Sequence, residues 1–80
     1  MEKEINICLE NVERAKEFVA IAEKFKGDID LLSGRYIVNG KSILGVLSLV
    51  LSNHMTAALH SDDQEELDKF AEMMKPFMIA

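Results

Sequence analysis

Alternating polar and apolar residues open the chain, a pattern typical of a strand with one buried face. The apolar positions within residues 4–9 are Ile5, Ile7 and Leu9. Apolar residues then recur at helical spacing, which predicts a helix with one buried stripe. That stripe consists of Val12, Ala15, Phe18, Val19, Ala22 and Phe25. Asn11 is a good N-cap for this helix, and Gly27 is a suitable C-terminal stop.

The middle of the chain predicts a hairpin followed by a segment that its pattern leaves ambiguous. Residues 28–32 and 35–39 are predicted as two strands joined by a tight turn at Ser33-Gly34. In residues 42–51, three β-branched residues would suit a strand: Ile43, Val46 and Val50. The leucines of the same segment, preceded by Ser42 as a cap, favour a helix instead. We predict the helix.

The last third of the chain predicts a strand and then a helix. Residues 56–60 form the strand, with Ala57 and Leu59 facing inward. Ser61 is followed three residues later by Gln64, which is the capping-box pattern at the start of a helix. The apolar stripe of that helix comprises Leu67, Phe70, Ala71 and Met74. Pro76 marks its end.

The order of these elements predicts an α+β fold. A length of 80 residues suits one domain, residues 1–80. An antiparallel sheet can expose one face to water, provided that helices cover the other. We therefore expect an open-faced β-sandwich, a four-stranded antiparallel sheet covered on one face by three helices in the order β-α-β-β-α-β-α.

Composition narrows the classes of function. A net charge of −5 without a focused basic patch argues against nucleic acid and acidic membranes as partners. The longest apolar run, residues 43–51, is about half the ~20 residues of a membrane span. No basic stretch followed by an apolar core opens the chain, so a signal peptide is not expected. Cys8 has no second cysteine to pair with, which suits the reducing cytoplasm.

Residues suited to catalysis or metal binding are scarce. His54 and His60 lie six residues apart, which does not fit the close helical pair of many zinc sites. Cys8 has no predictable histidine or lysine partner that would activate its thiol. The carboxylates of residues 62–68 are expected to form a solvated helix face. We therefore expect no enzymatic activity, no metal and no cofactor.

The segment Asn39 to Leu49 reads NGKSILGVLSL. It closely resembles the pattern around the second helix of the histidine-containing phosphocarrier (HPr) family of the bacterial sugar phosphotransferase system. There, valine and asparagine lead into Lys-Ser-Ile-Met/Leu-Gly-(Val/Leu)-Met/Leu-Ser-Leu. The resemblance extends without gaps from about Ile5 to Phe70, and the family has the same order of strands and helices. It therefore implies the same fold.

The resemblance breaks down at the family's phosphoryl-accepting site. In the family, the carrier histidine caps the first helix within Gly-(Ile/Leu)-His-Ala-Arg-Pro-Ala. In gapless register this chain reads LENVERA over residues 9–15. Asn11 then takes the position of the histidine, and Glu13 takes that of the arginine. Because an amide cannot form a phosphohistidine, the resemblance implies a member that does not carry phosphate at this site.

A second family feature is retained. The serine at the start of the second helix, which a kinase modifies in Gram-positive relatives, corresponds to Ser42. A phosphate there would meet free N–H donors and add about −1.5 to −2 of charge. The alternative is that Ser42 only caps the helix. The resemblance also places Ile43, Leu44 and Leu47 in an exposed apolar patch that contacts partner proteins. The alternative for these three is that they belong to the core.

These observations favour a small cytoplasmic regulator or adaptor that acts by binding a protein. Candidate partners are a transcription regulator, a kinase or components of the phosphotransferase system. A second hypothesis is a phosphocarrier-type protein with a relocated acceptor, His54 or His60. A third is a purely structural interaction domain, because a fold by itself does not determine function.

Overall fold

The structure is a computed structural model that describes residues 2–50 and 54–79. The elements in chain order are β1 (Glu2–Ile7), α1 (Val12–Ala22), β2 (Asp28–Ser33), β3 (Tyr36–Asn39), α2 (Ile43–Ser48), β4 (Met55–His60), α3 (Gln64–Met73) and a 3₁₀ turn, η1 (Lys75–Phe77). The ambiguous segment is therefore helical over Ile43–Ser48, and residues 49–50 form a turn, so the helix is shorter than predicted. Only residue 51 of the predicted helix lies outside the described residues.

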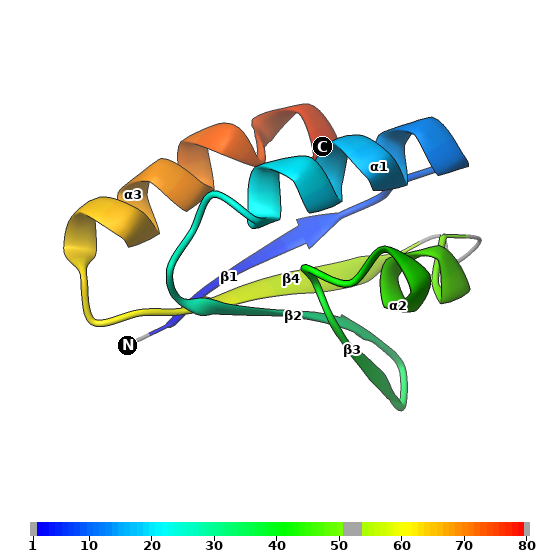
Figure 1. The fold of residues 1–80 in the computed structure, drawn as a ribbon, viewed down its shortest axis with the longest axis horizontal. Helices are drawn as coiled ribbons and strands as arrows, with labels where there is room; N and C mark the ends of the chain where they lie inside the picture. Colours follow the sequence, from blue (N-terminus) through cyan, green and yellow to red (C-terminus); the bar gives the residue numbers. More distant parts are fainter. Residues whose placement is uncertain (1, 51–53, 80) are drawn as a thin grey trace.

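Four strands form one antiparallel sheet in the order β1-β4-β2-β3. Figure 1 shows α1 and α3 lying side by side above the sheet, and α2 packs against α1 and β3. On the other face of the sheet, no helix of residues 2–50 or 54–79 is present (Figure 1). This confirms the predicted open-faced α+β fold with three helices and a four-stranded antiparallel sheet.

The hydrophobic core lies between the sheet and the helices. The alternating positions of the strands are buried as their pattern predicts: Ile5, Ile7, Ile29, Leu31, Ala57 and Leu59. Two pairs of phenylalanines meet edge to face in this layer. Phe18 of α1 contacts Phe77 with ring centroids 6.0 Å apart, and Phe25 contacts Phe70 at 5.6 Å. Such pairs add to the gain from burying apolar area, so they help fix α1 against η1, and the loop after α1 against α3.

The prediction that the first helix continues to Gly27 is wrong. It ends at Ala22, where the chain tightens because the next amides bond three residues back rather than four: Lys24 to Ile21 and Phe25 to Ala22. Phe25 is buried all the same. A Cβ at Gly27 would overlap the carbonyl oxygen of His60, so close approach to β4, rather than helix capping, explains this glycine.

Two other boundaries shift by one or two residues. The turn of the hairpin is at Gly34-Arg35, one residue later than predicted, and Gly34 has the positive φ of 59° that such a turn requires. The N-cap of α3 is Asp63, not Ser61, because the Asp63 carboxylate accepts from the Glu65 amide at 3.0 Å. Ser61 instead accepts a hydrogen bond from the Asp63 amide.

Candidate functional site

The start of α1 is an exposed turn capped by an asparagine. Asn11 has an extended backbone, and its Oδ1 accepts from the Arg14 amide at 2.9 Å. Glu10, just before it, has a left-handed φ of 67°, and the Asn11 amide bonds across it to the Leu9 carbonyl at 2.7 Å. The cap predicted from the sequence is thus confirmed. The Asn11 side chain therefore caps the N-terminus of α1.

The charged side chains of this turn are paired with their own neighbours or with the C-terminal segment. The ammonium of Lys16 lies 4.0 Å from the Glu13 carboxylate. The Arg14 guanidinium donates to the Pro76 carbonyl and lies 4.6 Å from the centre of the Phe77 ring. Arg14 therefore fastens the start of α1 to η1. Nothing in the sequence pattern pointed to this contact, which joins residues 62 positions apart.

Ser42 begins α2 as its N-cap. Its Oγ accepts from the Gly45 amide at 3.3 Å, and its carbonyl accepts from the Val46 amide at 2.9 Å. Asn39 prepares this turn, since its side chain accepts from the Lys41 amide at 2.8 Å and its carbonyl from the Ser42 amide at 3.0 Å. The Ser42 side chain is exposed. The capping role predicted for Ser42 is therefore observed, and the hydroxyl remains at the surface.

Next to Ser42, Lys41 and Glu66 hold the loop between α1 and β2 from two sides. The Lys41 ammonium donates to the Phe25 carbonyl at 2.6 Å. The two oxygens of the Glu66 carboxylate accept from the Lys26 and Gly27 amides, each at 2.9 Å. Hydrogen bonds from these amides, first Lys26 and then Gly27, lower the pKa of Glu66. The sequence predicted that Glu66 belongs to a solvated helix face. In the structure its carboxylate instead binds the loop between α1 and β2.

The three residues of the expected apolar patch differ in exposure. Leu44 is 79% exposed and Ile43 is 37% exposed, so both are available at the surface beside Ser42. Leu47 is only partly exposed and packs against the core. Val46, on the inner side of the same helix, is fully buried. The outward apolar surface of α2 is therefore formed mainly by Leu44 and Ile43.

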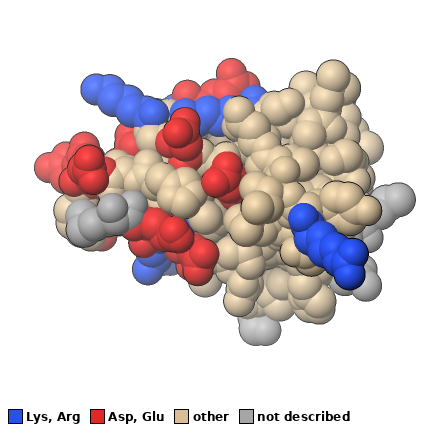
Figure 2. All heavy atoms as spheres, turned by 90° about the horizontal axis from the view of Figure 1, so that it is seen from below, with Lys and Arg blue, Asp and Glu red and all other residues tan. Residues whose placement is uncertain are grey.

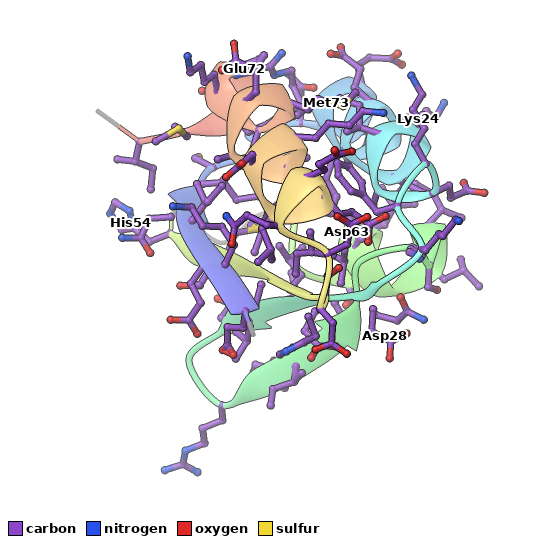
Figure 3. The ribbon with its side chains drawn as sticks, turned by 90° about the vertical axis from the view of Figure 1, so that its left-hand side faces the viewer. Lys24, Asp28, His54, Asp63, Glu72 and Met73 are labelled. Carbon is purple, nitrogen blue, oxygen red and sulfur yellow. The ribbon has the colours of Figure 1, made fainter. Side chains whose placement is uncertain are left out.

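The two histidines lie in different surroundings. His60 faces two carboxylates of neighbouring strands, with Nε2 3.0 Å from Asp30 and Nδ1 3.6 Å from Glu2. His54 is exposed, just before β4 and away from Asp63 and Glu72 of the α3 layer (Figure 3). Within residues 2–50 and 54–79, no group of three or more histidine, cysteine or acidic side chains could hold a metal ion. Cys8 is a half-buried free thiol.

The open-faced sheet, the capped start of α1 and the serine-capped α2 together define a small open-faced α+β domain. A family model described as the PTS HPr component phosphorylation site matches residues 11–77. The chain therefore belongs to the HPr family of the phosphotransferase system. Proteins of this family are phosphocarriers rather than catalysts, and they interact with other proteins of that system.

Two solved structures of HPr proteins resemble this one. HPr-C-His from Thermoanaerobacter tengcongensis is 33% identical, with 90% of this chain and 89% of that chain covered and a TM-score of 0.71. The phosphocarrier protein HPr from Bacillus anthracis str. Ames is 31% identical, with 90% and 93% covered and a TM-score of 0.68. No curated protein gives a significant match. Among the described helices, none has the length and apolar character needed to cross a membrane.

Proposed function

We propose that this protein is a regulatory or adaptor member of the HPr family that works by binding a protein, without carrying phosphate at the start of α1. One observation carries the proposal. The residue that caps α1 is Asn11, whose Oδ1 accepts a hydrogen bond from the Arg14 amide, and the gapless resemblance aligns it with the family's histidine. A carboxamide offers no nucleophile that could form a phosphoramidate, so phosphoryl transfer to this position has no acceptor.

The charges around Asn11 support the same conclusion. Free amides at a helix start favour an anion, yet Glu10 and Glu13 place two exposed carboxylates there. Like charges a few ångströms apart repel, and an incoming phosphoryl group is itself anionic. The Arg14 guanidinium is directed toward Pro76, Phe77 and the Glu17 carboxylate, and in the described structure it forms no ion pair with Glu10 or Glu13.

The relocated-acceptor hypothesis receives little support from the geometry. Both ring nitrogens of His60 face carboxylates, Asp30 at 3.0 Å and Glu2 at 3.6 Å. A phosphoryl group on either nitrogen would lie against a negative charge and would displace the contact with Asp30 or Glu2. His54 is exposed and is not at the start of a helix, so no helix dipole would stabilise a phosphate on it.

We further propose that phosphorylation of Ser42 regulates partner binding. The hydroxyl is exposed at the surface, and it lies beside the exposed side chains of Ile43 and Leu44. A phosphate would add about −1.5 to −2 of charge at the edge of this apolar surface. Docking of an apolar partner against Leu44 would then require desolvation of that charge, so phosphorylation would change the choice of partner.

The first test asks whether enzyme I of the phosphotransferase system can phosphorylate the protein. Incubated with enzyme I and phosphoenolpyruvate, the protein should acquire no acid-labile phosphate, because position 11 has no acceptor. Intact-mass spectrometry at neutral and at acidic pH measures this directly, with an authentic HPr as positive control. Stoichiometric acid-labile phosphate would contradict the proposal. His54→Ala and His60→Ala variants would then show whether a relocated histidine accepts it.

The second test separates the switch from the cap. Ser42→Asp keeps a capping side chain, so the free energy of unfolding should change by no more than about 0.5–1 kcal/mol. Binding to the partner should nevertheless change, because the charge at the patch has changed. Ser42→Ala should lose about 1 kcal/mol through the missing cap whether or not Ser42 is a switch. If Ser42→Asp binds each partner like the wild type and the family's serine kinase leaves Ser42 unmodified, Ser42 is only a cap.

A further inference from the structure

The face of the sheet that carries no helix has an ordered arrangement of side chains. Its outward positions follow from the alternation of the strands and from their register. They form three rows across the sheet: Glu2, His60 and Asp28; then Glu4, Ala58, Asp30 and Asn39; then Asn6, Thr56, Leu32 and Ile37. The rows change from acidic at one end of the face to apolar at the other.

The first two rows are strongly acidic. Four carboxylates and no lysine or arginine occupy the outward positions of the sheet, namely Glu2, Glu4, Asp28 and Asp30. Only Glu2 and Asp30 have a partner, the ring of His60. Glu4 and Asp28 make no hydrogen bond or ion pair within the described part of the chain. Two carboxylates of this face are therefore free to meet positive charge from outside.

The third row provides an exposed apolar side chain next to this charge. Ile37 on the edge strand β3 is 65% exposed, and its cross-strand neighbour Leu32 is half-buried. Figure 2 shows this side of the molecule, with the red carboxylates gathered toward one end and, at the other, a mainly tan surface that also carries basic (blue) side-chain atoms. In Figure 3, Asp28 lies at the level of the sheet, whereas Lys24 and Glu72 project from the helical layer. All of these outward positions belong to the strands, and none belongs to α2.

We propose that this open face is a second docking surface, which binds a basic, amphipathic segment of a partner protein. Lysine or arginine side chains of the segment would meet Glu4 and Asp28, and an apolar side chain would cover Ile37. Charge complementarity selects this occupant, because the outward positions of the described strands offer unpaired carboxylates and carry no lysine or arginine. The proposal is independent of Ser42 and of the patch on α2.

Other occupants do not match the charge of this face. Nucleic acid and acidic lipid surfaces are anionic, so the four carboxylates would repel them. Stacking a second copy face to face would bring two acidic surfaces together, which costs energy without a compensating cation. A basic segment instead pairs its charges with the carboxylates, and its apolar side chain shields Ile37 from water.

The spacing of the rows sets the size of the segment. Successive outward residues of a strand are about 6.5–7 Å apart, so the first and third rows lie about 13 Å apart. A helical segment covers that distance in about nine residues at 1.5 Å each. One helix of about 15 residues, with leucines on one end of its inner face and lysines on the other, would reach all three rows.

The probe is therefore a synthetic helical peptide of about 15 residues with this arrangement of leucine and lysine. Titrated into the isotopically labelled protein, it should bind saturably and shift amide signals of β1, β2 and β3 at outward positions. Its affinity should fall at least about tenfold between about 50 and 300 mM salt, because exposed charges are screened. The same peptide with glutamate in place of lysine should not bind.

Two matched double variants test the site. The double variant Glu4→Gln, Asp28→Asn removes the two unpaired carboxylates. It should lower the affinity for the peptide at least about tenfold. The control double variant Glu23→Gln, Glu65→Gln removes the same amount of charge from the helical side. It should lower the affinity for the peptide less than about threefold. Ile37→Ser should weaken the peptide without changing the salt dependence. Equal effects of the two double variants, shifts confined to α1 and α2, or no saturable binding would each overturn the proposal.

Discussion

Leu44→Asp should weaken binding of the protein to its partner by at least about 2 kcal/mol, roughly thirtyfold, while leaving the fold intact. Leu44 is 79% exposed, so its removal creates no cavity. It lies in the first turn of α2, where a carboxylate is tolerated by the helix dipole. In a complex, the new charge would be buried against an apolar partner surface without a counter-ion. Isothermal titration against the family's serine kinase and enzyme I measures the loss.

Neighbouring positions of the same helix serve as controls for this result. Leu47→Asp should lower the thermal midpoint, because Leu47 packs against the core, and is therefore a poor probe of binding. Val46→Asp should unfold the protein, since Val46 is fully buried. If Leu44→Asp binds both proteins as the wild type does while its circular dichroism is unchanged, α2 does not contact either protein. The partner-binding role proposed for Leu44 and Ile43 would then be wrong for both.

Gly27→Ala should lower the free energy of unfolding by about 3 kcal/mol, at the upper end of the range for overpacking. The new methyl group would overlap the carbonyl oxygen of His60 and would lie 3.1 Å from Leu59 Cδ1. A backbone oxygen within a sheet cannot move aside as a flexible side chain can. The loop would have to shift instead, which would also disturb the hydrogen bond from the Gly27 amide to Glu66. Urea denaturation followed by circular dichroism measures the change.

Gly34→Ala is the matched control for this substitution. Gly34 has a φ of 59°, but a Cβ there would meet no atom within 4 Å. Its alanine variant should lose only about 1–2 kcal/mol, the cost of a left-handed conformation for a residue with a side chain. A loss from Gly27→Ala no larger than that from Gly34→Ala would show that the α1–β2 loop can relax away from β4.

The local sequence pattern was sufficient to predict a structural feature wherever the interactions that form it join residues close together in the sequence. The alternation of Ile5 and Ile7 identified the buried face of β1, because side chains of a strand alternate in every environment. Ser42 and Asn11 were recognised as caps, because a cap bonds an amide only two or three residues away. The ambiguity of the segment that begins at Ile43 was resolved by the same serine together with the resemblance to the HPr family.

Contacts between distant residues decided the rest. The pattern extended the first helix to Gly27, but the chain leaves the helix at Ala22 and brings Gly27 against β4. The position of Glu66 in the sequence predicted a solvated helix face. Its carboxylate nevertheless accepts hydrogen bonds from two backbone amides of a loop about 40 residues away.

By itself, the sequence determined the order of the elements, their buried faces and the absence of a histidine at the start of the first helix, because these depend on residue type and short-range periodicity. Only the tertiary structure decided that Leu44 points to solvent while Leu47 packs inward. It also decided that Arg14 is held by η1 and that four carboxylates share the open face. These features depend on which distant residues the fold brings into contact. The spacing of side chains along the sequence does not determine those contacts.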